Sequence, residues 1–258
     1  MAGYPFTSAL VTGASSGIGE AIVGLLGRTG IPQVVVARRV DRLESLAAAY
    51  PNIEVLAADL TDRRGLAKVV KRVGSTADPV DLVVNNAGFG TSGPVHEADP
   101  ERLGREVALN VGAVTQLSHA AITAMRPRHR GFLLNVSSVA SFQPVANLGV
   151  YAATKAFVTS LTESLHEEAR GSGVHVTALC PGLTRTEFIE VSSGTSMSET
   201  YPKFAWMDAE EVARIGLADV AADRAISIPG LVNKSLVAAT SAMPRGLVRR
   251  LSTWVQSR

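Results

Sequence analysis

Short apolar runs alternate with amphipathic segments along almost the whole chain. Runs rich in valine, isoleucine and leucine predict strands at 9–11, 34–36, 53–58, 82–84, 132–136 and 174–179, with a further strand at 226–228. The intervening segments 18–26, 41–50, 64–73, 100–125 and 151–169 have helical spacing. Nearly continuous apolar strands between helices are typical of a parallel sheet that is covered on both faces. The pattern therefore predicts an α/β fold with a doubly wound parallel sheet of about seven strands.

The chain shows no repeat and no shift in composition, so we expect one domain spanning residues 1–258. Residues 184–207 interrupt the alternation, because a Ser/Gly-rich stretch at 192–196 lies there among large apolar side chains. This segment predicts a lid over an apolar substrate; an ordinary surface loop is the alternative. Asp208 and Glu211 have the spacing of a capping box that opens another helix.

Composition excludes several classes of protein. Hydrophobic residues make up 46% and charged residues 19% of the chain, which is typical of a globular protein. The single cysteine, Cys180, cannot form an internal disulfide. Neither a membrane-spanning run nor a signal sequence is recognisable, so we expect a cytoplasmic protein. Aromatic residues at 5% and dispersed basic residues argue against nucleic-acid binding, and the five histidines share no metal-ligand spacing, so no metal is expected.

A glycine-rich turn follows the first predicted strand and opens the first predicted helix. Glycines let the backbone approach a pyrophosphate, which the N–H groups and dipole of the helix N-terminus attract. The Gly-x-x-x-Gly-x-Gly spacing differs from the more common Gly-x-Gly-x-x-Gly motif. The turn therefore predicts a dinucleotide site formed by Gly13, Ser15, Ser16, Gly17, Ile18 and Gly19.

The second predicted strand ends in Arg38 and Arg39, and no acidic residue comes before Asp41. An acidic residue at this place binds free ribose hydroxyls, whereas an arginine accommodates a 2′-phosphate. We expect Arg38 to contact the phosphate and Arg39 to stack on the adenine, which predicts NADP(H) as the cofactor. The alternative is that both arginines are solvated residues at the start of a helix.

Tyr151 and Lys155 lie four residues apart in a segment with helical spacing. Such residues share one helical face. A free tyrosine has a pKa of about 10, and a neighbouring ammonium lowers it by favouring the phenolate. A pKa near 7 would need a shift of about three units, or roughly 4 kcal/mol. The pair is therefore a candidate acid–base couple, and an ordinary exposed helix pair is the alternative.

Further polar residues and glycines lie directly after predicted strands or within the long predicted helix. They are Asp59 after the third strand, Asn85-Asn86-Ala87-Gly88 after the fourth, Pro181-Gly182 after the sixth, Asn110 in the long helix and Ser138, thirteen residues before Tyr151. In this order, and with the glycine-rich turn and the Tyr-Lys pair, they resemble the short-chain dehydrogenase/reductase family. The resemblance covers about residues 6–230 and is to the compact NADP(H)-preferring branch with a basic C-terminal extension. It implies a Rossmann-type fold.

The resemblance also implies catalytic roles. Tyr151 would be the general acid–base group, and Lys155 would bind the nicotinamide ribose and lower the pKa of Tyr151. Ser138 would hydrogen-bond the substrate oxygen, with the adjacent Ser137 as the competing choice. Asn110 would hold a water that links Lys155 to solvent.

Further residues would contact the cofactor on the same resemblance. Asp59 would meet the adenine, Asn86 and Gly88 the ribose region, and Thr186 the nicotinamide amide. The remaining expected contacts are Leu60, Ala87, Tyr151, Lys155, Pro181, Gly182 and Thr184.

The implied reaction passes a hydride between the nicotinamide and a carbonyl carbon while Tyr151 exchanges a proton with the oxygen. A preference for NADPH favours reduction of a ketone or aldehyde. The start of the tail, Pro244-Arg245, resembles that of reductases acting on lipid-like ketones, including 3-oxoacyl groups and steroids. Alternatives are a non-catalytic NADP(H) sensor and an alcohol dehydrogenase working in the oxidative direction. A nucleotide-sugar epimerase or dehydratase would be expected to have a longer chain.

The C-terminal extension, residues 231–258, carries five basic and no acidic residues within a chain of net charge +2. Leu247, Val248, Leu251, Trp254 and Val255 fall on one helical face, with Arg249 and Arg250 beside them. A helix packed on its own domain or on a partner subunit is one interpretation, and we expect a homo-oligomer, with a dimer favoured. The other interpretation is peripheral contact with an anionic membrane surface.

Overall fold

The computed structural model describes residues 4–188, 192, 205–244 and 246. Its centre is a seven-stranded, wholly parallel sheet with the strand order β3-β2-β1-β4-β5-β6-β9. The strands are β1 (Ala9–Thr12), β2 (Gln33–Ala37), β3 (Ile53–Ala57), β4 (Leu82–Asn85), β5 (Gly131–Val136), β6 (Val174–Leu179) and β9 (Ile226–Ser227). The predicted doubly wound sheet is confirmed.

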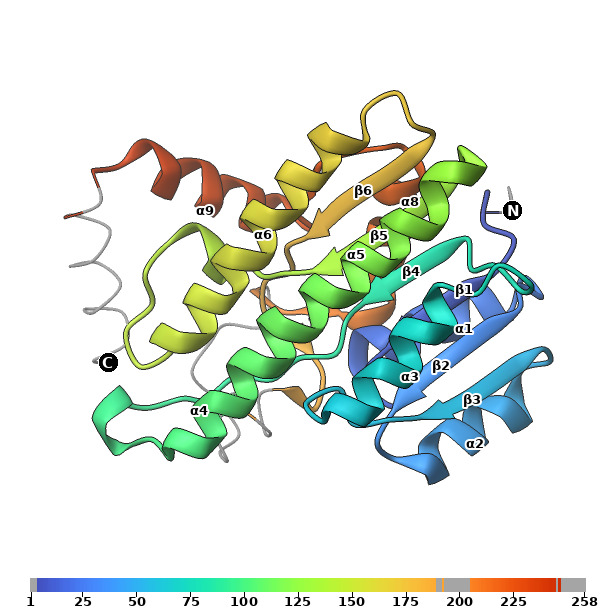
Figure 1. Ribbon diagram of the computed structural model, residues 1–258. Coiled ribbons are helices and arrows are strands. Elements are labelled where there is room, and N and C mark those ends of the chain that lie inside the picture. Colours follow the sequence, from blue (N-terminus) through green and yellow to red (C-terminus); the bar gives the residue numbers. More distant parts are fainter. Residues whose placement is uncertain (1–3, 189–191, 193–204, 245, 247–258) are drawn as a thin grey trace.

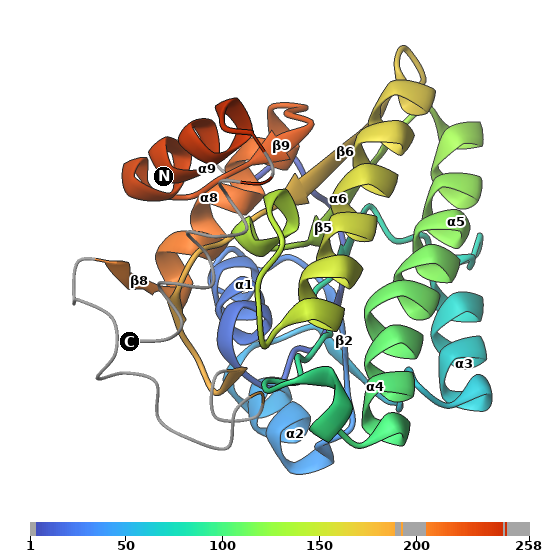
Figure 2. The same ribbon diagram turned by 90° about the vertical axis from the view of Figure 1, so that its left-hand side faces the viewer.

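Helices cover both faces of the sheet, as Figures 1 and 2 show. One face carries α1 (Gly17–Gly27), α2 (Val40–Ala49) and α8 (Ala209–Ala221). The other carries α3 (Arg63–Val73), α4 (Pro100–Val107), α5 (Val114–Met125) and α6 (Gly149–Ala169). Each face has its own apolar core, which explains why the central strands are apolar at nearly every position. A further helix, α9 (Leu231–Ala242), follows β9.

The predicted helix at 100–125 is continuous but not uniform. Asp99 accepts hydrogen bonds from the N–H groups of Glu101 and Arg102, and Pro100 occupies the first turn, so α4 begins with a complete N-cap. Between α4 and α5 lies a π-helical segment, Ala108–Ala113, with Asn110 inside it. Single π turns within helices occur often at functional sites.

A buried polar network joins β4, β5 and the two helices that cover them. The Asn85 side-chain amide donates to Asn135 Oδ1 at 2.8 Å and to Ser118 Oγ at 3.2 Å. Asn135 in turn donates to Thr162 Oγ1 at 3.0 Å. Because a buried polar group is costly unless it is hydrogen-bonded, these contacts favour one placement of α5 and α6 on the sheet.

The segment expected to form a lid is described only at its two ends and at Ser192. The ends pair as a two-stranded parallel sheet, β7 (Thr184–Arg185) with β8 (Met207–Asp208). Helix α8 begins directly after Asp208, as predicted, but the predicted capping box does not form. The Asp208 carboxylate caps no N–H group of the helix and instead accepts a hydrogen bond from Arg185 at 2.8 Å.

The amphipathic helical face predicted at 247–255 lies outside the described residues. In the part of the chain that is described, no helix is long and apolar enough to cross a bilayer.

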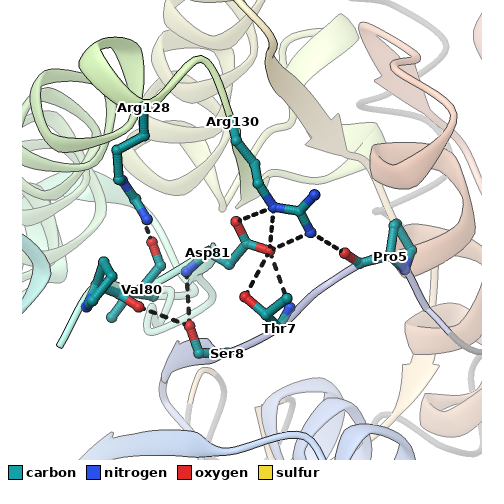
Figure 3. Close-up of polar contacts among 8 residues, drawn as sticks. Pro5, Thr7, Ser8, Val80, Asp81, Arg128 and Arg130 are labelled. Carbon is teal, nitrogen blue, oxygen red and sulfur yellow. Dashed lines mark hydrogen bonds and ion pairs between the residues drawn. The ribbon is translucent and has the colours of Figure 1, made fainter.

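The amino ends of three strands are tied together by the buried carboxylate of Asp81 (Figure 3). It accepts from the Thr7 N–H and hydroxyl groups at 3.0 and 3.2 Å and from Arg130 Nη2 at 3.0 Å. The Asp81 N–H donates to Ser8 Oγ, and Arg128 donates to the carbonyl of Val80. This cluster therefore fixes the chain entering β1, β4 and β5, at the edge of the sheet opposite the glycine-rich turn.

We predict that Asp81→Asn lowers the free energy of unfolding by about 2 kcal/mol, because an amide cannot accept from all these donors. Dinucleotide affinity should stay unchanged, since the cluster lies at the other end of the sheet. The control is Asp78→Asn, whose exposed carboxylate pairs with Arg72 and should contribute less than about 1 kcal/mol. Urea unfolding of the wild type and the two variants measures these changes. Equal losses of unfolding free energy in Asp81→Asn and Asp78→Asn would contradict the role of Asp81.

Candidate active site

A cavity of about 720 Å³ opens at the carboxyl ends of the strands. Parallel doubly wound sheets bind ligands at this edge, where the strand order reverses; here the reversal lies between β1 and β4. The glycine-rich turn, the ends of β2 to β6 and the first turns of α6 contribute to the wall. The chain thus brings most of the predicted site residues around one cavity.

The glycine-rich turn needs its glycines for different reasons. Gly13 and Gly17 have φ angles of +65° and +60°, which side-chain-bearing residues rarely adopt. A Cβ on Gly19 would lie against the carbonyl oxygen of Gly13 and 2.5 Å from the Asn86 amide nitrogen. That amide donates to the Thr12 carbonyl at 2.9 Å and to the Gly13 carbonyl at 3.2 Å. Asn86 therefore holds the turn against the end of β4.

The N-terminus of α1 faces this cavity. The helix begins at Gly17, and the Ser16 side chain caps none of its N–H groups. Ser15, Ser16, Gly17 and Ile18 all line the cavity. Uncapped N–H groups and the positive end of the helix dipole make this turn suitable for a phosphate.

The two arginines after β2 make different contacts. Arg39 donates to Ser15 Oγ at 3.2 Å and to the Ser15 carbonyl at 3.1 Å, and pairs with Glu187 at 2.9 Å. Arg38 lies 3.8 Å from Asp59, and its side chain is 76% exposed. Burial raises the pKa of Asp59, but hydrogen bonds from Thr61 and the charge of Arg38 together hold it below its usual value. Arg38 is thus the more open cation, while Arg39 braces the turn.

Tyr151 and Lys155 lie on the buried face of α6, 9% and 5% exposed. The Lys155 ammonium lies 5.7 Å from the centre of the Tyr151 ring and donates to the Val136 carbonyl at 2.8 Å. The ring of Phe188 packs against Tyr151 with centroids 5.3 Å apart. The phenol and the ammonium therefore share one space at the cavity floor, as the spacing predicted.

The expected direction of the Tyr151 pKa is wrong for the protein's own groups. Burial raises the pKa of Tyr151 to about 12, against the opposing hydrogen bond with Ser138. Burial also lowers the pKa of Lys155 to about 8. Desolvation disfavours both charged forms, and it is the largest effect on the pKa of each group. The low-dielectric setting makes any charge added beside the phenol more effective.

Ser138 and Ser137 point to different neighbours. Ser138 hydrogen-bonds the Tyr151 side chain and caps the short helix that follows β5 by accepting from the Ala140 N–H. Ser137 is buried, donates to the Lys155 carbonyl at 2.9 Å and lies 2.7 Å from Thr159 Oγ1. Ser138 is therefore placed beside Tyr151, whereas Ser137 anchors α6 to the sheet.

Asn110 lies behind the cavity wall, with its side chain fully engaged. Its Oδ1 accepts from the Phe89 N–H at 3.2 Å, and its Nδ2 donates to the Phe89 carbonyl at 2.8 Å and to Thr154 Oγ1 at 3.1 Å. It thus ties the π-helical segment to α6 and to the loop after β4. The other predicted cofactor contacts, Leu60, Ala87, Gly88, Pro181, Gly182, Thr184 and Thr186, line the cavity.

Two acidic residues near the site were missed by the sequence analysis. Glu187 lines the cavity and pairs with both Arg39 and Arg42. Glu106 is wholly buried in α4, one turn before Asn110. Its position inside the amphipathic helix beside Asn110 was the available signal. Among the described residues no cluster of side chains suits a metal ion.

Comparisons with known proteins identify the family to which this chain is similar. The family model for short chain dehydrogenase matches residues 7–195. An uncharacterized oxidoreductase of Staphylococcus aureus is 30% identical over 197 residues, covering 76% of this chain and 85% of that protein. A short-chain dehydrogenase from Sphingobium yanoikuyae, solved in complex with NADPH, has a TM-score of 0.81 and 31% identity over 92% of this chain and 96% of its own.

A second solved structure is the bulky-bulky ketone specific alcohol dehydrogenase from Comamonas testosteroni. Its TM-score is 0.77 at 30% identity, with 93% of this chain and 95% of that chain covered.

We predict that Gly19→Ala weakens binding of NADP⁺ at least about tenfold, or 1.4 kcal/mol, because the methyl group would displace the turn. The matched control is Gly104→Ala in α4, where nothing lies within 4 Å of the added methyl group. That change should stabilise the helix by about 0.5–1 kcal/mol and leave affinity unaltered. Isothermal titration of both variants tests this; wild-type affinity in Gly19→Ala would show that the turn is not the dinucleotide site.

Proposed function

The chain belongs to the short-chain dehydrogenase family, and from that premise we propose that it is an NADP(H)-dependent oxidoreductase that reduces a bulky, lipophilic ketone or aldehyde to an alcohol. The observation that carries the proposal is the grouping of Ser138 with the buried Tyr151 and Lys155 in the wall of the cavity that the glycine-rich turn also lines. The residue assignments below belong to the same proposal, as does the single domain 1–258.

The residues present fit a dinucleotide with a 2′-phosphate. The uncapped N-terminus of α1 would hold the pyrophosphate. Arg38, exposed beside Asp59 at the end of β2, would meet the 2′-phosphate, and Arg39 would hold Ser15 in place. Lys155 and Gly88 would face the nicotinamide ribose. The relative from Sphingobium yanoikuyae, which was solved with NADPH, supports this choice of cofactor.

The cofactor and the side chains of the protein would have different parts in catalysis. The nicotinamide, when bound, supplies or accepts the hydride. Tyr151 holds the proton that the substrate oxygen needs during reduction, and its raised pKa keeps that proton on the phenol at neutral pH. Ser138 donates a hydrogen bond to the same oxygen, where negative charge develops. Lys155 supplies positive charge behind Tyr151 and draws it toward the phenolate as the proton leaves.

Apolar side chains around the reacting groups support a lipophilic substrate. Phe89, Val139, Leu148 and Phe188 line the cavity on the Tyr151 side. The related Comamonas enzyme, named for bulky ketones, is consistent with this substrate class. The oxidative direction would use the same groups in reverse. A catalytically silent sensor is less well supported, because Ser138, Tyr151 and Lys155 are all present and grouped.

We predict that Tyr151→Phe lowers kcat by about 10²–10⁴-fold while NADPH binding is nearly intact, since only the proton donor is lost. NADPH consumption with aliphatic 3-oxoesters, steroid ketones and small diketones provides the readout. Turnover by the variant at the wild-type rate would reject the role of Tyr151. A wild-type protein that binds NADPH but turns over no ketone or alcohol would favour the sensor instead.

A separate prediction concerns cofactor choice. Arg38→Ala should lower kcat/KM for NADPH by about ten- to a hundredfold, as expected for a lost charged hydrogen bond, and leave kcat/KM for NADH unchanged. Arg42→Ala is the matched control, because Arg42 pairs with Glu187 and does not line the cavity. Comparable efficiency of the wild type with both cofactors would remove Arg38 from this role.

A further inference from the structure

Glu106 is the most unusual ionisable residue near the site. Its side chain is 0% exposed; neither carboxylate oxygen makes a hydrogen bond of good geometry, and Thr91 is the neighbour whose hydroxyl and N–H groups act on it as donors. Glutamate is almost never fully buried without a partner, since burial of an unpaired charge is very costly. The packing of α4 alone does not require a carboxylate here, because an apolar side chain would fill the same space.

The surroundings of Glu106 connect it to the proposed catalytic groups. It lies one helical turn from Arg102 on one side and from Asn110 on the other, so the three share a face. Helix α4 packs against α6, which carries Tyr151 and Lys155. A Cβ on Gly88 would lie 3.0 Å from Asn110 Oδ1 and 3.4 Å from Lys155 Nζ, so the ammonium and Asn110 are neighbours.

Glu106 acts on the ionisation of both Lys155 and Tyr151, and Lys155 acts on that of Glu106. Burial raises the pKa of Glu106, while Thr91, Arg102 and Lys155 act to lower it. Burial lowers the pKa of Lys155, and the negative charges of Cys180 and Glu106 would raise it. Glu106 also raises the pKa of Tyr151. Lys155 and Glu106 thus favour each other's charged form.

Other candidates for the counter-charge of Lys155 are weaker. The Cys180 thiol is buried with its pKa raised by that burial to about 11, so it is neutral in the working range. The bond from Lys155 to the Val136 carbonyl offers a dipole but no charge. Among the described residues, Glu106 is the carboxylate that acts on Lys155.

We propose that Glu106 is the buried counter-charge of Lys155, a positioning residue that keeps the lysine protonated inside the low-dielectric site. The inference rests on the proposed function, because the charge of Lys155 matters only if Tyr151 exchanges a proton. The same negative charge holds the proton on Tyr151, which suits a site that delivers a proton to a carbonyl oxygen.

The first test measures the ionisation of Lys155 without turnover. In protein with ¹⁵N-labelled lysine, the Lys155 signal is assigned by its loss in Lys155→Arg, and its midpoint is followed against pH. The wild-type midpoint is expected near pH 8. Glu106→Gln should lower it by about one pH unit, a tenfold change in the protonation constant. An unmoved midpoint overturns the proposal.

The second test uses the pH profile of carbonyl reduction. The rate of the wild type should fall above about pH 8, as Lys155 loses its proton. In Glu106→Gln this limb should move to lower pH, and the rate should recover toward the wild-type value when the pH is lowered. Glu101→Gln is the matched control, since it removes an exposed carboxylate from the same helix. Glu101→Gln should change neither the Lys155 titration midpoint nor the pH at which the rate falls. A fall in rate that shifts equally in Glu106→Gln and Glu101→Gln overturns the proposal.

A purely structural role is separated by Glu106→Leu. This variant should lower the Lys155 midpoint as Glu106→Gln does, although its stability differs, because leucine leaves no unpaired polar group in the core. If the Lys155 midpoints of Glu106→Gln and Glu106→Leu differ in step with their thermal stabilities, although both variants lack the carboxylate, the proposal is overturned. If the wild type reduces no carbonyl compound, the proposed function fails, whereas the lysine titration still decides whether Glu106 and Lys155 are coupled.

Discussion

Burial of an ammonium and a phenol on one face of α6 is the constraint on which the rest of the site depends. Lys155 and Tyr151 are held where water is scarce, so both charged forms are disfavoured and each added charge acts strongly. The hydrogen bond that Lys155 donates to the Val136 carbonyl at the end of β5 offsets part of the free-energy cost of burying the ammonium. Asn110 binds Thr154 of α6. The polar network of Asn85 and Asn135 fixes α5 and α6 against the sheet. The positions of Tyr151 and Lys155 are thus set by the core.

The parallel sheet gives the site its shape. Because all strands run in one direction, their carboxyl ends meet at one edge, and the glycine-rich turn, Arg38, Asp59 and Ser138 converge there from different parts of the chain. The opposite edge is closed by Asp81, which binds the segments leading into β1 and β5. The Asp81 cluster thus holds together the amino ends of the strands, and the cavity lies at their carboxyl ends, so substitutions at the two ends should have separable effects.

The fold and the membership of the cavity wall were predictable because they depend on local pattern. Strand-like runs, helical spacing and the turn at Gly13–Gly19 are properties of neighbouring residues, and the resemblance to a family supplied the order of the rest. The ionisation of Tyr151 was not predictable, because it depends on how deeply α6 is buried and not on the spacing of Tyr151 and Lys155. The burial of Glu106 and the ion pair of Glu187 with Arg39 were missed for the same reason: both depend on contacts between residues distant in sequence. The choice between Ser137 and Ser138 followed from spacing, but the anchoring contact of Ser137 needed the structure.

The most direct measurement is a crystal structure of the protein with NADP⁺ and an alcohol or ketone bound in the cavity. We predict that the substrate oxygen lies within about 3.2 Å of both the Tyr151 hydroxyl and Ser138 Oγ, with the carbinol or carbonyl carbon facing the nicotinamide. A substrate oxygen bound away from Tyr151, with the phenol turned toward bulk water, would contradict it.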